Sequence, residues 1–246
     1  MHPLLGRFGP FFLYTYQYVW GLGILGGLAL AYALTPRPRR AADWFDPLLL
    51  GLMAGIFGGR VATVAVHWDY YRVTPGEIWL VWRGGLSYHG ALLAALAGMW
   101  LWDRWRGGNW MWNAGILPLL LPLLHLTGWF ACYWQGCGYG KLALPGLLAA
   151  DLPDNYGVFD LRYQTQLLGM GLSLLVLLLS IYARRRKMPP RNSFWLTLPL
   201  LAGTNLLLWP WRGDQITIVG FWVDAALVIG SLLALLLGGN AGSKQS

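Results

Sequence analysis

Residues 218–237, IVGFWVDAALVIGSLLALLL, form an apolar run of 20 residues in which Asp224 is the single charged side chain. A helix rises about 1.5 Å per residue, so about 20 residues cross the roughly 30 Å hydrocarbon core of a bilayer. This run therefore predicts a membrane-spanning helix near the end of the chain.

The composition places the rest of the chain in the same class. Of its 246 residues, 57% are hydrophobic and 11% are charged, and the mean hydropathy is +0.47. These values are typical of integral membrane proteins and exclude an ordinary soluble domain. The 16 tryptophans and 12 tyrosines fit a protein whose amphipathic rings lie at both membrane interfaces.

Similar apolar runs recur along the whole sequence. We predict an all-α integral membrane protein with seven transmembrane helices in a single domain, residues 1–246. The predicted spans are 12–34, 47–68, 86–102, 113–133, 164–183, 194–209 and 218–237. The longest loop, near residues 136–163, is expected on the outer side.

Lysine and arginine predict the orientation of these helices. Eleven of the 18 basic residues flank one set of helix ends and six flank the other. The positive-inside rule then places the N-terminus outside and the C-terminus in the cytoplasm. The basic runs RPRR (37–40) and ARRRK (183–187) follow spans directly. We interpret them as topology signals and anionic-lipid contacts, and we predict no nucleic-acid partner.

Two polar residues stand out against the apolar background. Arg60 lies inside a predicted span, where a charged side chain needs a partner or an anionic ligand. Two alternative explanations of Arg60 are that its side chain snorkels to the outer interface, or that it forms an ion pair with Asp69 or Asp224. His89 follows two glycines and a Ser-Tyr pair at a predicted helix mouth, and imidazole accepts a proton near neutral pH. It is therefore a candidate base; the alternative is a hydrogen-bonded interfacial residue.

The chain has two cysteines, Cys132 and Cys137, near the outer end of the fourth predicted span. A continuous helix would place them on different faces, so a disulfide would require local unwinding at Gly136 and Gly138. We expect free, packed thiols. A zinc site would need two further soft ligands, and His125 is the only imidazole nearby, so we predict no metal.

The segment around His89, GGLSYHGALLA (84–94), resembles the central signature of the prolipoprotein diacylglyceryl transferases, multi-pass enzymes of the bacterial cytoplasmic (inner) membrane with seven spans. Five further segments resemble the family in order and spacing: FGPFFLYTYQYVWGLGILGG (8–27), GGRVATVAV (58–66), GWFACYWQGCGYG (128–140), RYQTQL (162–167) and WPWRGD (209–214).

The resemblance implies a reaction and its residues. Family members move a diacylglyceryl group from phosphatidylglycerol to the lipobox cysteine thiol of an exported prolipoprotein, forming a thioether and releasing glycerol phosphate, without a metal or organic cofactor. By position, His89 would be the base or proton handler, and Tyr16 would be a hydrogen-bonding partner in catalysis. The residues that would bind the phosphate and other substrate groups are Arg60, Arg83, Ser87, Tyr88, Gly90, Arg212 and Asp214.

The chain departs from the family pattern at three positions. Family arginines are replaced by Trp129 and Asn205, and a family glutamate is replaced by Trp209. Basic residues that would restore the lost charge are Arg83, Lys141 and Arg162. Two hypotheses follow: a divergent transferase, or a catalytically degenerate relative that acts as a lipid-binding or structural subunit, with other membrane-complex subunits as partners.

Overall fold

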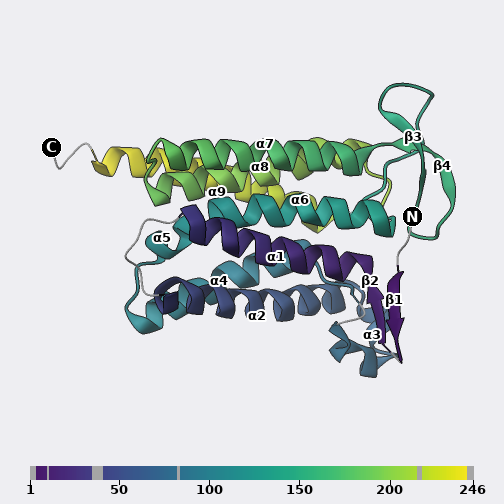
Figure 1. Cartoon of the computed structure of the whole chain (residues 1–246), viewed down its shortest axis with the longest axis horizontal. Helices are drawn as coiled ribbons and strands as arrows, with labels where there is room; N and C mark the ends of the chain where they lie inside the picture. The colour runs from purple at the N-terminus through teal and green to yellow at the C-terminus, as the bar shows by residue number, and fades with distance from the viewer. Residues whose placement is uncertain (1–3, 10, 35–40, 82–83, 215–217, 243–246) are drawn as a thin grey trace. The chain divides into compact units, whose positions relative to one another are not determined.

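The computed structural model describes residues 4–9, 11–34, 41–81, 84–214 and 218–242 and is mostly helical (Figure 1). Contacts divide the chain into two units, which are described separately: Met1–Thr35 with Ala114–Ser246, and Pro36–Asn113. We call them unit 1 and unit 2. The long helices of the described residues are α1 (Thr15–Leu34), α2 (Ala41–Val66), α4 (Tyr88–Arg106), α6 (Leu117–Gln135), α7 (Thr165–Arg185), α8 (Pro190–Leu208) and α9 (Ile218–Gly242).

These long helices coincide with the predicted spans, with ends that differ by a few residues. Four segments are long and apolar enough to cross a membrane, judged by length and composition: Phe45–Val66, Ala114–Gln135, Thr165–Arg185 and Ile218–Leu237. They match the second, fourth, fifth and seventh predicted spans. Spanning by α1, α4 and α8, and the orientation of the termini, remain predictions.

In unit 1, α6 packs against both α1 and α7, and α8 packs against α7 and α9. The ribbons of α6, α7 and α8 run alongside one another in Figure 1. Glycines let α1 approach α6 closely: a Cβ on Gly23 would lie 2.3 Å from Thr127 Oγ1, and one on Gly27 would lie 2.4 Å from Leu120 Cδ1. Small residues at contacts are how helices associate where lipid removes the hydrophobic driving force.

In unit 2, α2 and α4 form the most extensive helix pair. Gly51, Gly55 and Gly59 follow one another at four-residue spacing and therefore share one face of α2. A Cβ on Gly55 would lie 3.1 Å from the carbonyl oxygen of Ala91 on α4. The two backbones are thus close, and the position of α4 depends on the small residues of α2.

Two antiparallel hairpins add strands to the predicted all-α fold. β1 (Leu4–Phe8) pairs with β2 (Phe11–Tyr14), and Gly9 turns between them with a φ of +59°. The first predicted span was therefore wrong at residues 12–14, because their backbone groups pair across the hairpin and α1 begins at Thr15. β3 (Ala149–Pro153) pairs with β4 (Phe159–Tyr163) inside the predicted loop.

Short helices complete the described chain: α3 (Trp68–Tyr71) and η1 (Pro75–Trp79) lie between α2 and α4, α5 (Trp110–Asn113) and η3 (Ala114–Ile116) precede α6, and η4 (Trp209–Trp211) follows α8.

Candidate functional site

The predicted site residues Ser87 to Gly90 lie together at the start of α4 in unit 2. Ser87 is the N-cap, and its Oγ accepts a hydrogen bond from the Gly90 amide at 3.3 Å. The Ser87 amide donates to the carbonyl oxygen of Gly59 on α2 at 3.0 Å. A capped helix start that is also bonded to its neighbour holds its first turn in place. His89 lies in that turn.

The His89 imidazole packs against Tyr88 edge to face, with ring centroids 5.1 Å apart and an interplanar angle of 75°. His89 is half-buried, and Tyr88 is 39% exposed. The imidazole thus combines a fixed backbone with partial exposure, so it is accessible from outside the helix pair.

Arg60, on α2, is 6% exposed and donates to four backbone carbonyl oxygens. Its Nε donates to Ile78 at 2.9 Å, its Nη1 donates to Gly84 at 2.8 Å and to Gly85 at 3.2 Å, and its Nη2 donates to Glu77. The guanidinium thereby fastens the segment that precedes α4 onto α2. The turn makes this possible because Gly84 and Gly85 adopt φ values of +88° and +70°, which favour glycine.

The partners of Arg60 differ from the two carboxylates considered from the sequence. Asp69 instead forms an exposed ion pair with Arg72 at 3.1 Å, and Asp224 belongs to unit 1. The suggested ion pair with Asp69 was therefore wrong. Carbonyl dipoles stabilise the guanidinium without cancelling its charge, and Tyr71 adds a cation–π contact at 5.1 Å. Arg83, the neighbouring predicted contact, lies outside the described residues.

Arg212 and Asp214, both predicted site residues, form an ion pair in unit 1. Arg212 Nε donates to Asp214 Oδ1 at 2.8 Å, and Nη2 donates to Oδ2, so the pair is bidentate. The Arg212 guanidinium carbon lies 5.2 Å from the centre of the Trp129 ring. The Gly213 amide also donates to the Tyr139 carbonyl at 2.8 Å, which ties this turn to the segment after α6.

The remaining predicted catalytic residue, Tyr16, is half-buried in the first turn of α1 and belongs to unit 1. The predicted residues therefore fall into two groups. Ser87, Tyr88, His89 and Gly90 are brought together with α2 in unit 2, where Arg60 fastens the preceding turn. Arg212 and Asp214 are brought together in unit 1.

Trp129, one of the departures from the family pattern predicted from the sequence, is 6% exposed. Its indole fills the space that two glycines leave: a Cβ on Gly169 would lie 2.4 Å from the ring, and one on Gly138 would lie 2.9 Å from it. Arg162, named from the sequence as a replacement cation, pairs with Asp154 at 3.2 Å. Its charge is therefore already balanced, whereas Lys141 is exposed.

The expectation of free thiols at Cys132 and Cys137 was wrong, because the two residues form a disulfide with a Cα–Cα distance of 4.6 Å. α6 ends at Gln135, and Gly136 caps it in the left-handed region at a φ of +82°. This local turn removes the continuous helix that would have kept the two side chains apart.

A set of polar contacts inside unit 1 was missed from the sequence. His125 on α6 lies within hydrogen-bond distance of Ser173 on α7 and Asn205 on α8, and Asn205 bonds to Asp224 on α9. The available signal was the presence of two ionisable residues, His125 and Asp224, inside predicted spans. Among the described residues, no group of three or more His, Cys, Asp or Glu side chains is arranged to hold a metal ion.

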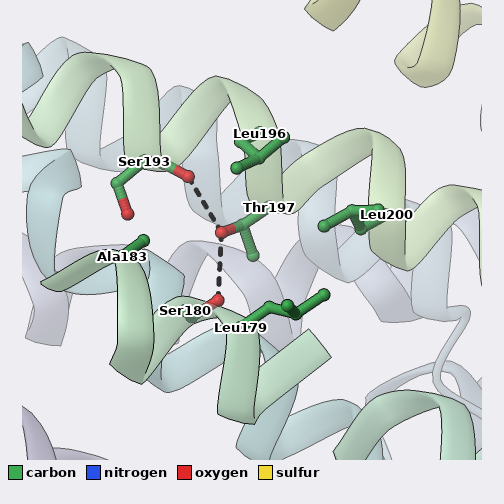
Figure 2. A pocket seen from close by; sticks show the side chains of 7 residues that line it. All are labelled: Leu179, Ser180, Ala183, Ser193, Leu196, Thr197 and Leu200. Carbon is green, nitrogen blue, oxygen red and sulfur yellow. Dashed lines mark hydrogen bonds between the residues drawn. The ribbon is translucent and has the colours of Figure 1, made fainter. Parts of the chain in front are cut away.

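A small hollow lies between α7 and α8 (Figure 2). Ser180 lies 3.2 Å from Thr197 Oγ1, which donates to the Ser193 carbonyl at 2.9 Å. The hydroxyls of Ser180 and Thr197 are therefore hydrogen-bonded to each other. The lining residues are Leu179, Ser180, Ala183, Ser193, Leu196, Thr197 and Leu200, none of which is ionisable.

Comparison with curated proteins gives relatives that share one name. The chain is 29% identical over 193 residues to the phosphatidylglycerol–prolipoprotein diacylglyceryl transferase of Dechloromonas aromatica (strain RCB), covering 77% of this chain and 73% of the relative. It is 28% identical to that of Methylibium petroleiphilum, covering 83% and 80%. With the Fervidobacterium nodosum protein, identity is 29%, and the chain spans about half of the relative, 46% of its length.

The profile of one protein family agrees with these relatives. The family described as prolipoprotein diacylglyceryl transferase matches residues 3–238. This range includes all the helices that carry the two groups of site residues. Because the match extends over nearly the whole chain, the chain belongs to the prolipoprotein diacylglyceryl transferase family.

Proposed function

We propose that the chain transfers the diacylglyceryl group of phosphatidylglycerol to the thiol of a prolipoprotein cysteine. The carrying observation is the family match across residues 3–238. In this reaction the cysteine sulfur bonds to a glycerol carbon while the bond from that carbon to the phosphate oxygen breaks. A base must take the thiol proton, and positive charge must stabilise the departing glycerol phosphate.

His89 is the base in this proposal. Its position in the first turn of α4 is fixed by Ser87, which caps the helix and bonds to Gly59. Unpaired amides give a helix N-terminus partial positive charge, which favours anionic groups such as a thiolate or a phosphate. Tyr88 packs on the imidazole and restricts its orientation. Gly90 lets α4 approach α2, and Tyr16 is a hydrogen-bond donor to the substrate.

Arg60 and Arg212 have different electrostatic roles in the proposed reaction. Arg60 donates to carbonyl oxygens, which do not neutralise its positive charge. That charge can therefore stabilise a phosphate electrostatically. Arg212 shares its charge with Asp214 and has to divide its donors between that carboxylate and a substrate. We therefore assign the stronger electrostatic contribution to Arg60, and we propose Arg83 as a further phosphate contact.

The proposed setting is the bacterial cytoplasmic membrane, with the N-terminus outside and the C-terminus inside. Phosphatidylglycerol would reach the site from the bilayer, and the prolipoprotein cysteine from the outer side. The excess of basic residues at one set of helix ends supports this orientation. The chemistry assigned to the side chains needs no metal or organic cofactor.

The test is mass spectrometry of a lipobox peptide incubated with the purified protein and phosphatidylglycerol. We expect a mass gain of one diacylglyceryl group that disappears with His89→Gln. The matched control is His67→Gln, because His67 is an exposed histidine of the same unit with no proposed part in catalysis. Transfer should survive in this control.

Two results would contradict the proposal. Full transfer by a folded His89→Gln protein would remove His89 from the role of base. No transfer by the wild-type chain, while an active family member modifies the same peptide, would favour the alternative of a non-catalytic lipid-binding or structural subunit.

A further inference from the structure

The chain between α6 and α7 contains an apolar segment that lies outside the long helices. Residues 142–150, LALPGLLAA, are nine residues without a charged or hydrogen-bonding side chain, flanked by Lys141 and Asp151. No residue of this segment belongs to the site proposed above. Turns and loops in water are usually rich in polar residues such as asparagine, aspartate and serine. The composition of this apolar segment therefore indicates a partner other than water.

The leucines of the apolar segment are unusually exposed. Leu144 is 86% exposed and Leu147 is 93% exposed, while Leu142 and Leu148 are 64% and 47% exposed. Single exposed apolar residues are common on protein surfaces, but a group of them marks a surface that contacts another protein or a membrane. The four side chains are thus available to an apolar partner.

Backbone hydrogen bonds hold the apolar segment at two places. The Ala143 amide donates to the Leu161 carbonyl of β4 at 2.9 Å. The Leu148 carbonyl accepts from the Gln164 amide at 2.9 Å, and Gln164 Nε2 donates to the Ala149 carbonyl at 3.3 Å. The leucines between these places therefore have a fixed position relative to β4 and Gln164.

Gln164 places the apolar segment beside the end of a long apolar helix. It is the N-cap of α7, and Thr165–Arg185 is long and apolar enough to cross a membrane. β3 and β4 lie beyond this end of α7 (Figure 1). Consecutive Cα atoms are about 3.8 Å apart, so Leu147 is one such step from Leu148, which is bonded to Gln164. The most exposed leucine is therefore close to the start of α7.

The exposed leucines of α7 continue the same apolar surface. Leu167, Leu174 and Leu178 are all exposed, and their spacing of seven and four residues places them on one face of the helix. Leu167 lies in the first turn, three residues after Gln164. The surface that lipid would cover along α7 thus extends to the helix end where the apolar segment is bonded.

We propose that the apolar segment is a membrane anchor, whose leucines insert into the lipid leaflet beside the start of α7. Irregular backbone exposed to lipid does not enter the hydrocarbon core, because its polar groups would lack partners. The insertion is therefore shallow, about 5–10 Å into the boundary between headgroups and acyl chains. Lys141 is exposed directly before the anchor, where its charge favours lipid phosphates. The anchor does not depend on the proposed transfer reaction.

Fluorescence of the full-length protein in lipid nanodiscs tests the anchor. Leu147→Cys introduces one reactive thiol for a nitrobenzoxadiazole dye, because Cys132 and Cys137 are joined in a disulfide. We expect the emission of this dye to shift to the blue. Spin labels attached to the lipids just below the headgroup should quench it, whereas iodide in the water should quench it little.

The matched control is Asp151→Cys, because Asp151 is an exposed polar residue of β3 directly after the apolar segment. Its dye should be quenched by iodide. Equal quenching of the two dyes by iodide would overturn the proposal in favour of a solvated loop. A dye at residue 147 that neither quencher reaches would overturn it in favour of a protein contact.

A second pair of variants tests whether the leucines insert together. Leu144→Ser, combined with the dye at residue 147, should shift the emission towards that of the dye in water and increase quenching by iodide. Val158→Ser is the control, because Val158 is also exposed but lies in the turn between β3 and β4. Equal shifts with the two serine variants, or no shift with Leu144→Ser, would refute the anchor.

Discussion

Gly90 on α4 lies against Gly58 on α2 so closely that a Cβ on Gly90 would come within 2.7 Å of the Gly58 carbonyl oxygen and 2.4 Å of the Ala62 Cβ. Backbone and β-carbon atoms have no rotamer by which to move away. The glycine that follows His89 in sequence is therefore one of the small residues that set the separation of the two helices, so the position of the proposed base depends on this contact.

Replacing Gly90 with alanine should force α2 and α4 apart. We expect a loss of about 1–3 kcal/mol in the free energy of unfolding, the usual effect of overpacking, together with weaker His89-dependent transfer. Thermal unfolding in detergent micelles and the peptide assay measure the two effects. Gly203→Ala on α8 is the control, because its Cβ would meet nothing within 4 Å. Equal stability of the two variants would show that the contact does not set the helix spacing.

Replacing Arg60 with lysine retains the charge but loses the four-way connection to the turn before α4. One ammonium cannot reach carbonyls that Nε, Nη1 and Nη2 contact from different sides. A hydrogen bond to a charged group contributes about 1.5–3 kcal/mol. We therefore expect the free energy needed to open the segment around residues 75–85 to fall by at least that amount.

Limited proteolysis of substrate-free protein detects this opening. Faster cleavage of the 75–85 segment in Arg60→Lys is the expected result, and Arg72→Lys is the control because its ion pair with Asp69 is exposed and contributes little. If Arg60→Lys lost transfer activity while its cleavage rate matched the wild type, a direct role at the phosphate would replace the positioning role.

The long helices could be predicted from the sequence because each depends on local information. An apolar run of sufficient length must satisfy its own backbone groups, so residues 218–237 predict α9 without knowledge of any neighbour. The N-terminal hairpin was missed because its strands are short, and the apolar residues 12–14 continue into α1 without a change in composition.

The partners of buried polar groups could not be predicted, because they come from distant segments. Arg60 bonds to carbonyls 17 to 25 residues away, and carbonyl groups leave no trace in the side-chain sequence. His125 and Asn205 are 80 residues apart and meet through the packing of α6 and α8. The disulfide was misjudged because it depends on where α6 ends, and helix ends are the least certain part of a sequence-based assignment.

Because Trp129 packs directly against Gly169, we predict that substitutions at these two positions have strongly coupled effects on the free energy of unfolding. A Cβ on Gly169 would lie 2.4 Å from the indole, so Gly169→Ala should destabilise the wild type by about 1–3 kcal/mol. Trp129→Ala should lower stability by about 3–5 kcal/mol because it empties a buried site. With the indole removed, the added methyl of Gly169→Ala meets space and its effect should vanish.

A double-mutant cycle in thermal or denaturant unfolding measures this coupling. The control is Gly171→Ala on the same helix, where a Cβ meets nothing within 4 Å, combined with Trp129→Ala. Additive effects of Gly169→Ala and Trp129→Ala would show that the indole does not occupy the space above Gly169.

The Cys132–Cys137 disulfide should stabilise the junction of α6 with α7. Immediately after the bond, the Cys137 carbonyl accepts from Gln166 Nε2 at 3.1 Å and the Gly138 carbonyl accepts from Thr165 Oγ1 at 2.7 Å. Closing a loop of this length contributes roughly 2 kcal/mol. We therefore expect a reductant to lower the unfolding temperature of the wild type, but not that of a Cys132→Ser, Cys137→Ser double variant.

Alkylation of the unreduced protein in intact bacterial membranes checks the bond where it forms. A disulfide persists in an oxidising compartment, so a bond at this end of α6 agrees with the proposed outer location of residues 136–163. We expect the two thiols to be modified only after reduction. Modification without reduction would contradict both the bond and the stability difference that it predicts, and would remove this support for the proposed outer location of residues 136–163.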